Sequence, residues 1–308
     1  MTHASTPSLS SRRHLLKGAA AAAAGFVPGL AGASDSRPRI VASFSILADM
    51  AREIAPPDAE VTALVGPDAD AHVFNPTPAD GRRLAQAGLV VVNGLGFEGW
   101  IERLVKVSGY RGPVVVATQG LKPRQGGHHG EDPHAWQDLA HARLYAQNIA
   151  RGVSARWPEH RAQTESRLAD YLQRIAALQA QVLAWLEPVP RAERRVITGH
   201  DAFGYFAQAY GIEFLAPRAW TTSSEPSAAA GARLIRQIRE QRVKALFLEN
   251  ISDPRLIERI AAESGARVGG TLYSDALSGQ KGPASTYLKL FEHNARTVAT
   301  ALGSKVVR

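Results

Sequence analysis

The segment PEHRAQTESRLADYLQRIAALQAQVLAWL, residues 158–186, divides the chain into two halves of similar pattern. Its apolar side chains recur at spacings of three and four, and Gln, Arg and Glu fill the opposite positions, as in an amphipathic helix. A helix of this length is ~40 Å long, and Pro188 and Pro190 end it. The pattern covers too few heptads to favour a coiled coil, so we expect one stiff connection between two lobes. The apolar positions are Leu168, Tyr171, Leu172, Ile175, Leu178, Val182, Leu183 and Leu186.

Short runs rich in β-branched residues lie on both sides of this helix. Near-continuous apolar runs such as Leu89–Val92 suit strands that are buried on both faces, as in parallel sheets covered by helices. Alternation of such strands with helices predicts an α/β fold. We therefore expect two similar lobes, each a roughly four-stranded, mostly parallel sheet flanked by helices, joined by one long rigid helix. The predicted strands are Arg39–Phe44, Glu60–Val65, Leu89–Leu95 and Pro113–Thr118 in the first half, and Arg194–Thr198, Ile212–Leu215, Val243–Glu249 and Ala266–Tyr273 in the second.

The first 33 residues stand apart from this pattern. A basic SRRHLLK stretch at 11–17 leads into an alanine-rich run and an Ala-Gly-Ala end at 31–33, which resembles a twin-arginine signal peptide with its cleavage site. The apolar stretch at 18–30 is shorter than the ~20 residues that a membrane span needs. We therefore expect export to the periplasm. The expected segments are the signal peptide at 1–33, an N-terminal α/β lobe at 34–157, the linking helix at 158–187 and a C-terminal α/β lobe at 188–308.

Composition narrows the possible chemistry. The 308 residues include ten His and no Cys, which excludes disulfides, thiolate zinc sites, iron–sulfur clusters, cysteine nucleophiles and cysteine-anchored lipids. Any bound metal must therefore have nitrogen and oxygen ligands. The formal charge of +8 falls to +5 without the signal peptide, which holds three basic residues and no acid. The sequence has no long block of Lys or Arg, so it gives no support for nucleic-acid binding.

Four metal-capable side chains lie just after predicted strands, where ligands bind to open parallel sheets. Each alone has an ordinary alternative as a loop or cap residue, and Asp275 in particular suits a helix N-cap. Two come from each half, so lobes that close face to face would bring them together. They are His72 in DAHVFNPTPAD (70–80), His134 in EDPHAW (131–136), His200 in ITGHDAF (197–203) and Asp275 in LYSDAL (272–277).

These four segments, in this order, resemble the metal-site segments of the periplasmic zinc/manganese-binding proteins of ABC transporters. The likeness extends over essentially the whole chain after the signal peptide, including the long helix. It implies two α/β lobes bridged by one helix, with the metal in the cleft between them. It also implies a receptor and not an enzyme, with a membrane permease as partner, and we expect a monomer. The resemblance assigns metal ligation to His72, His134, His200 and Asp275.

Ligand chemistry favours zinc. Three imidazoles and one carboxylate fill a tetrahedral site, and manganese-type members of the family commonly have Glu where this chain has His200. Manganese or iron stays open, because cells also select metals by availability. A zinc hydrolase is an alternative of another class, since catalytic zinc also uses three protein ligands. Against it, Asp275 as fourth ligand leaves no position for an activated water, and no His-Glu-x-x-His helix is present.

Two further features concern the surroundings of these ligands. His128 and His129 lie in a Gly-rich stretch at 125–131, which is either a tether that captures zinc or a solvated loop. Asp132 and Glu249 are candidates for acceptors that orient ligating imidazoles. For Asp132, a cap on the turn before the following proline is the alternative.

Overall fold

The computed structural model describes residues 37–126, 130–215, 228–241 and 243–306. The predicted signal peptide and His128 and His129 lie outside these residues. Among the described helices, none has both the length and the apolar character that crossing a membrane requires.

The N-terminal lobe is built on a parallel sheet in the order β2-β1-β3-β4. Its central strand β1 pairs with both neighbours, and Ile40 lies opposite Val61 on one side and Leu89 on the other. Apolar side chains project from both faces of the sheet, and helices cover both. Helices α2 and α3 pack on one face, and α1 and α4 pack on the other. The strands are β1 (Arg39–Phe44), β2 (Glu60–Val65), β3 (Leu89–Val92) and β4 (Val114–Val116), and the helices are α1 (Ser45–Ile54), α2 (Pro78–Ala85), α3 (Ile101–Ser108) and α4 (Leu139–Arg156).

The C-terminal lobe repeats this plan with a parallel sheet in the order β10-β9-β7-β8. Counted from β8, this sheet places the second, first, third and fourth strands of its lobe side by side, as the first sheet does. A register shift between Val268 and Gly270 bends β10. Helices α7 and α8 cover one face of this sheet. The strands are β7 (Arg195–Ile197), β8 (Glu213–Leu215), β9 (Ala245–Glu249) and β10 (Arg267–Leu272), and the helices are α6 (Gly204–Tyr210), α7 (Ala228–Gln241), α8 (Arg255–Ser264) and α9 (Tyr287–Ala301).

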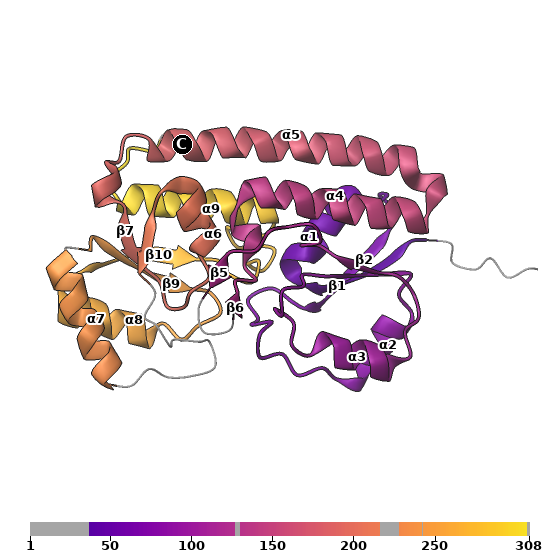
Figure 1. Ribbon diagram of the computed structural model, residues 1–308, viewed down its shortest axis with the longest axis horizontal. Helices are drawn as coiled ribbons and strands as arrows, with labels where there is room; N and C mark the ends of the chain where they lie inside the picture. Colours follow the sequence, from indigo (N-terminus) through magenta and orange to yellow (C-terminus); the bar gives the residue numbers. More distant parts are fainter. Residues whose placement is uncertain (1–36, 127–129, 216–227, 242, 307–308) are drawn as a thin grey trace, which may run out of the picture. The chain divides into compact units, whose positions relative to one another are not determined.

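Helix α5 (Arg161–Leu186) runs past both lobes, with α4 packed against one part of it and α9 against another (Figure 1). Its buried face includes Tyr171, Ile175 and Val182, as the spacing predicts. One continuous hydrophobic core joins side chains of both lobes to this face. The two sheets, their strands and the long helix confirm the predicted fold class.

The remaining elements are short. Three 3₁₀ turns are η1 (Ala135–Gln137), η2 (Pro158–His160) and η3 (Arg191–Glu193). The first residues of the predicted linking helix thus form η2, and α5 follows directly. Strands β5 (Gln125–Gly126) and β6 (Gly130–Glu131) form a two-stranded antiparallel pair just before the segment that carries His134.

Candidate metal centre

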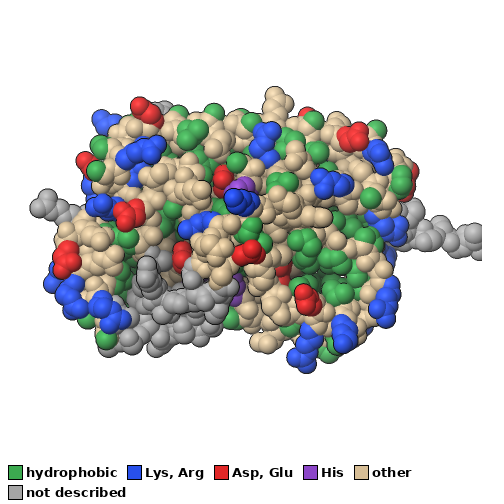
Figure 2. Space-filling model, in the orientation of Figure 1, with side chains coloured by type: hydrophobic (Ala, Val, Ile, Leu, Met, Phe, Trp, Pro, Cys, Tyr) green, Lys and Arg blue, Asp and Glu red, His purple; other side chains and the backbone are tan. Residues whose placement is uncertain are grey.

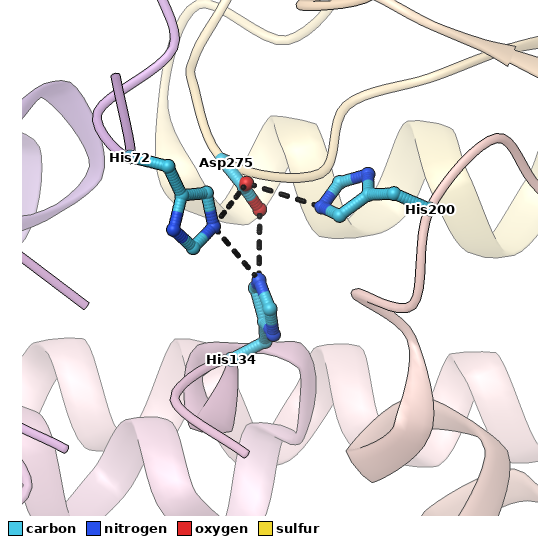
Figure 3. A group of neighbouring side chains, drawn as sticks. All are labelled: His72, His134, His200 and Asp275. Atoms are coloured by element: carbon cyan, nitrogen blue, oxygen red, sulfur yellow. Dashed lines mark hydrogen bonds and ion pairs between the residues drawn. The ribbon is translucent and has the colours of Figure 1, made fainter. Parts of the chain in front are cut away.

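Four side chains from both lobes converge on one point (Figure 3). They are the four that the sequence singles out: His72, His134, His200 and Asp275. Asp275 Oδ2 lies 3.3 Å from His72 Nε2 and 3.3 Å from His200 Nε2, and Asp275 Oδ1 lies 3.7 Å from His134 Nε2. The Nε2 atoms of His72 and His134 are 3.3 Å apart. All four potential ligand atoms lie within 4.8 Å of one another.

These separations suit a tetrahedral ion. Zinc bonds of about 2.0–2.2 Å to nitrogen and oxygen place tetrahedral ligand atoms about 3.3–3.6 Å apart. Three of the four separations given above are 3.3 Å, at the lower end of this range, and the fourth, 3.7 Å, slightly exceeds its upper end. The side chains therefore surround a space of the right size for one divalent cation.

His72 is held by the loop that follows β2. Its backbone N–H donates to Asp70 Oδ1 at 2.8 Å, and the indole of Trp100 donates to the carbonyl of Ala71 at 2.8 Å. Its ring meets Phe97 edge-on. The His72 side chain is 28% exposed, whereas the other three are 7% exposed or less. The site therefore opens to solvent on the His72 side.

His134 is oriented by Asp132. Asp132 Oδ1 accepts from His134 Nδ1 at 2.7 Å and from the His134 backbone N–H at 3.0 Å, so the carboxylate both orients the ring and caps the turn. The second oxygen of Asp132 accepts from Arg124 at 2.5 Å. The amide of Asn93 donates to the carbonyl of Pro133 at 2.9 Å. Asp132 therefore contacts both the imidazole and the backbone of the turn, so the two interpretations do not exclude each other.

His200 follows β7 and is oriented by Glu249, at the end of the neighbouring strand β9. Glu249 Oε1 accepts from the His200 backbone N–H at 2.9 Å, and Glu249 Oε2 lies 2.6 Å from His200 Nδ1. The Glu249 side chain is fully buried. A carboxylate this close favours a proton on Nδ1, so that Nε2, which faces Asp275, is the nitrogen that can bind a metal.

Asp275 lies in a loop that residues of the other lobe hold in place. The indole of Trp136 and the amide of Gln137 both donate to the carbonyl of Ser274, at 2.9 and 2.8 Å. Asp275 does not cap a helix, because α9 begins only at Tyr287 with Thr286 as its cap. Its carboxylate is fully buried, and neither oxygen has a well-formed hydrogen bond with a described residue. Buried charge of this kind needs a cation.

Asp68 makes a further link between the lobes beside the site. Its carboxylate accepts from the Asn250 amide at 3.0 Å and from the Gly279 N–H at 3.1 Å, and its own N–H donates to the Leu277 carbonyl at 2.9 Å. Its φ of 53° is left-handed, which is uncommon for a residue other than glycine. The loop that carries His72 is thereby fastened to the loop that carries Asp275.

Sequence reasoning missed Asp68, Trp136 and Gln137, because their roles depend on contacts between segments far apart in the chain. The only available signal is position, since Asp68 lies four residues before His72, and Trp136 and Gln137 lie two and three residues after His134.

The electrostatics of the site favour charged imidazoles at His72 and His200 opposite an ionised Asp275 carboxylate. Burial opposes a charge on His200, but Glu249 and Asp275 outweigh it and hold the pKa of His200 well above its usual value. Burial likewise opposes a charge on His72, and its interaction with Asp275 raises the pKa nonetheless. Burial would raise the pKa of Asp275, yet His200 and His134 hold it well below the usual range. A metal entering the site therefore displaces protons.

Comparison with known proteins gives relatives along nearly the whole described chain. Residues 40–301 match the family model described as "Zinc-uptake complex component A periplasmic". The iron-binding protein YfeA of Yersinia pestis is 33% identical over 272 residues, covering 86% of each chain. The zinc-binding protein TroA of Treponema pallidum is 30% identical, covering 88% of this chain and 90% of its own.

Solved structures agree in fold. The periplasmic zinc-binding protein TroA from Treponema pallidum superposes with a TM-score of 0.82 at 27% identity, over 86% of this chain and 99% of that one. A manganese-bound periplasmic metal-binding protein from Candidatus Liberibacter asiaticus gives a TM-score of 0.79 at 27% identity, over 86% and 100%. Proteins similar to this chain are thus named for zinc, manganese and iron.

Proposed function

This chain belongs to the family of the periplasmic component A of the zinc-uptake complex, and from that membership we propose that it captures Zn²⁺ in the periplasm and delivers it to an ABC importer. It is a metal-binding substrate-binding protein of an ABC transporter. The family consists of solute-binding receptors, so the zinc hydrolase considered above is set aside. The ion itself is cargo, and the partner that receives it is a membrane permease.

In this proposal the ligands are His72, His134, His200 and Asp275. The observation that carries it is the buried Asp275 carboxylate, whose oxygens form no well-formed hydrogen bond with a described residue and face three imidazole nitrogens at 3.3–3.7 Å. Three nitrogen donors and one oxygen at tetrahedral spacing suit zinc better than the oxygen-rich, six-coordinate surroundings that manganese favours. Relatives named for manganese and iron make those ions the competing cargo.

The remaining features of the proposal concern processing and assembly. We propose a twin-arginine signal peptide at 1–33, lobes at 34–157 and 188–308, and a linking helix at 158–187. We also propose that the protein acts as a monomer, since one chain supplies all four ligands.

A competition titration with zinc and manganese tests the metal and the ligands together. We expect wild type to bind one zinc ion and to prefer zinc over manganese. His200→Ala should weaken zinc binding by at least about tenfold, with an unchanged circular dichroism spectrum. His160→Ala, a histidine outside the site, is the matched control and should bind like wild type. A preference for manganese would refute zinc as cargo, and a His200→Ala protein that binds like wild type would refute the ligand assignment.

A further inference from the structure

An open groove lies between α2 and α3 of the N-terminal lobe, directly beside His72. Its volume is about 900 Å³. The loop at 72–78 forms one wall, and apolar side chains of that loop and of α3 line much of it. On the face drawn in Figure 2, hydrophobic side chains are exposed on this lobe, with Lys and Arg side chains and a few acidic ones at their edges. The apolar lining includes Val73, Phe74, Trp100, Leu104 and Val107.

Two of these side chains are unusually exposed for their type. Val107 is 71% exposed and Val73 is 48% exposed. Phe74 packs against Trp100 with ring centroids 4.8 Å apart, which gives the groove a firm aromatic wall. Contiguous exposed apolar surface of this kind marks a site of interaction with another molecule.

The groove also carries positive charge without compensation. Arg82 of α2 and Arg103 of α3 both line it. Neither guanidinium group forms a hydrogen bond or ion pair with any described residue, and the described lining contains no acidic side chain. Two unpaired guanidinium groups around an apolar surface complement an apolar segment that carries acidic side chains.

Gly81 leaves the groove open at the middle of α2. Glycine in a helix interior costs about 1 kcal/mol relative to alanine. A Cβ at this position would meet only Leu104 Cδ1, at 4.0 Å, so packing within the chain does not require glycine here. The missing side chain instead lets another molecule approach the helix backbone closely.

The walls of the groove are preformed. The Thr77 backbone N–H and hydroxyl donate to Asp80 Oδ2 at 2.8 and 2.7 Å, and Pro78 begins α2. This capping box and the prolines fix the loop that also carries His72. Binding to such a rigid surface loses little conformational entropy.

We propose that this groove binds an acidic, amphipathic segment of the importer's membrane permease. The inference rests on the proposed function, and position argues for this occupant. His72 is the most exposed of the four candidate ligands, so the metal leaves on its side of the site. A permease segment seated in the groove would touch the loop of His72 and place the receiving channel beside the exit.

Other occupants fit the observations less well. A small ligand is mostly enclosed by its pocket, but this groove leaves Val107 largely exposed. A second copy of this chain would bring two basic molecules together, because the formal charge is +5 once the proposed signal peptide is removed. An acidic partner avoids that repulsion.

The test measures delivery separately from binding. Zinc-loaded protein is added to spheroplasts of the producing bacterium from which its gene has been deleted, and uptake of radioactive zinc is followed. The groove variants are Val107→Asp and the double variant Arg82→Glu with Arg103→Glu. The matched controls are Leu183→Asp on α5 and Arg143→Glu on α4, which change exposed residues of similar type far from the groove along the chain.

We expect both groove variants to bind zinc with the wild-type affinity and to deliver it about tenfold more slowly. The controls should deliver like wild type, and wild-type delivery should weaken at high salt. Delivery by both groove variants at the wild-type rate would overturn the proposal, as would an equal loss in the controls. A wild-type dimer in light scattering that Val107→Asp dissociates would assign the groove to a second copy instead. Failure of wild type to bind zinc would refute the proposed function, and this result is distinct from a loss of delivery in the groove variants alone.

Discussion

Replacing Glu249 with Gln exchanges one carboxylate oxygen beside the candidate metal centre for an NH₂ group, which removes a negative charge and changes almost no volume. Glu249 Oε1 accepts from the His200 backbone N–H, and Oε2 faces His200 Nδ1 at 2.6 Å. In Glu249→Gln, the amide oxygen keeps the first contact and the NH₂ group then faces Nδ1. Nδ1 must become the acceptor, which moves the ring proton to Nε2, the atom that faces Asp275.

The size of the effect follows from this exchange of tautomers. A protonated Nε2 cannot bind a metal, so His200 must either rotate or give up one hydrogen bond to act as a ligand. Loss of such an acceptor typically weakens metal affinity by about 10- to 100-fold, which is about 1.4–2.7 kcal/mol. The fold should persist, because the amide occupies the same buried position and still binds the backbone N–H.

Competition with a fluorescent zinc chelator measures the affinity, and urea unfolding of the metal-free protein measures stability. Glu258→Gln on α8 is the matched control, because this exposed side chain forms no hydrogen bond or ion pair with a described residue. Zinc affinity of Glu249→Gln equal to that of the control would refute the tautomer argument. So would a loss of affinity that merely follows a loss of folded protein.

Three other perturbations test neighbouring parts of the account. As the pH is lowered, zinc affinity should fall by about tenfold per pH unit for each proton that zinc displaces. The fall should begin above the ordinary imidazole pKa of about 6.5, because the pKa of His200 is raised. Titrations at several pH values that give a constant affinity would contradict this. Asp68→Gly keeps the left-handed backbone and removes two hydrogen bonds between lobes, so zinc should dissociate roughly tenfold faster in a stopped-flow chelator assay, and an unchanged rate would exclude this link. Burial raises the pKa of Asp49 to about 6, although its carboxylate accepts a hydrogen bond from the Tyr287 N–H. In the unfolded chain this group ionises at lower pH, so the unfolded state is favoured as the pH rises. The free energy of unfolding of metal-free wild type should therefore decrease as the pH is raised from about 4 to about 6. Urea unfolding of Asp49→Asn should lack that fall, and a pH dependence identical to wild type would show that another group is responsible.

Much of the architecture could be predicted from local pattern. Each predicted β-branched run contains a strand of the structure. Continuous apolar runs such as Leu89–Val92 are typical of strands in a sheet that helices bury on both faces. The spacing along α5 likewise predicted which side chains lie inward, Tyr171 and Ile175 among them. Both signals depend on periodicity within a single element.

The candidate ligands could be identified because sheet topology places the ends of parallel strands together. Glu249 reaches His200 for this reason, since β9 pairs with β7. Asp275 was harder, because an Asp after a strand usually caps a helix, whereas here an irregular loop runs on to Thr286 before α9 begins.

Contacts that depend on how the two lobes meet left no signal in the sequence beyond their position near a candidate ligand. Asp68 meets Gly279 across more than 200 residues, and Trp136 meets Ser274 across more than 100. The groove beside His72 is similar, because exposed Val107 and unpaired Arg82 look like ordinary surface residues until α2 and α3 are placed side by side.

The most direct test of the central claim is a crystal structure of the zinc-loaded protein with anomalous data collected on both sides of the zinc absorption edge. The account predicts one strong peak, about 2.0–2.2 Å from Nε2 of His72, His134 and His200 and from a carboxylate oxygen of Asp275. A peak elsewhere, or an ion at this site that one of the four side chains does not contact, would contradict it.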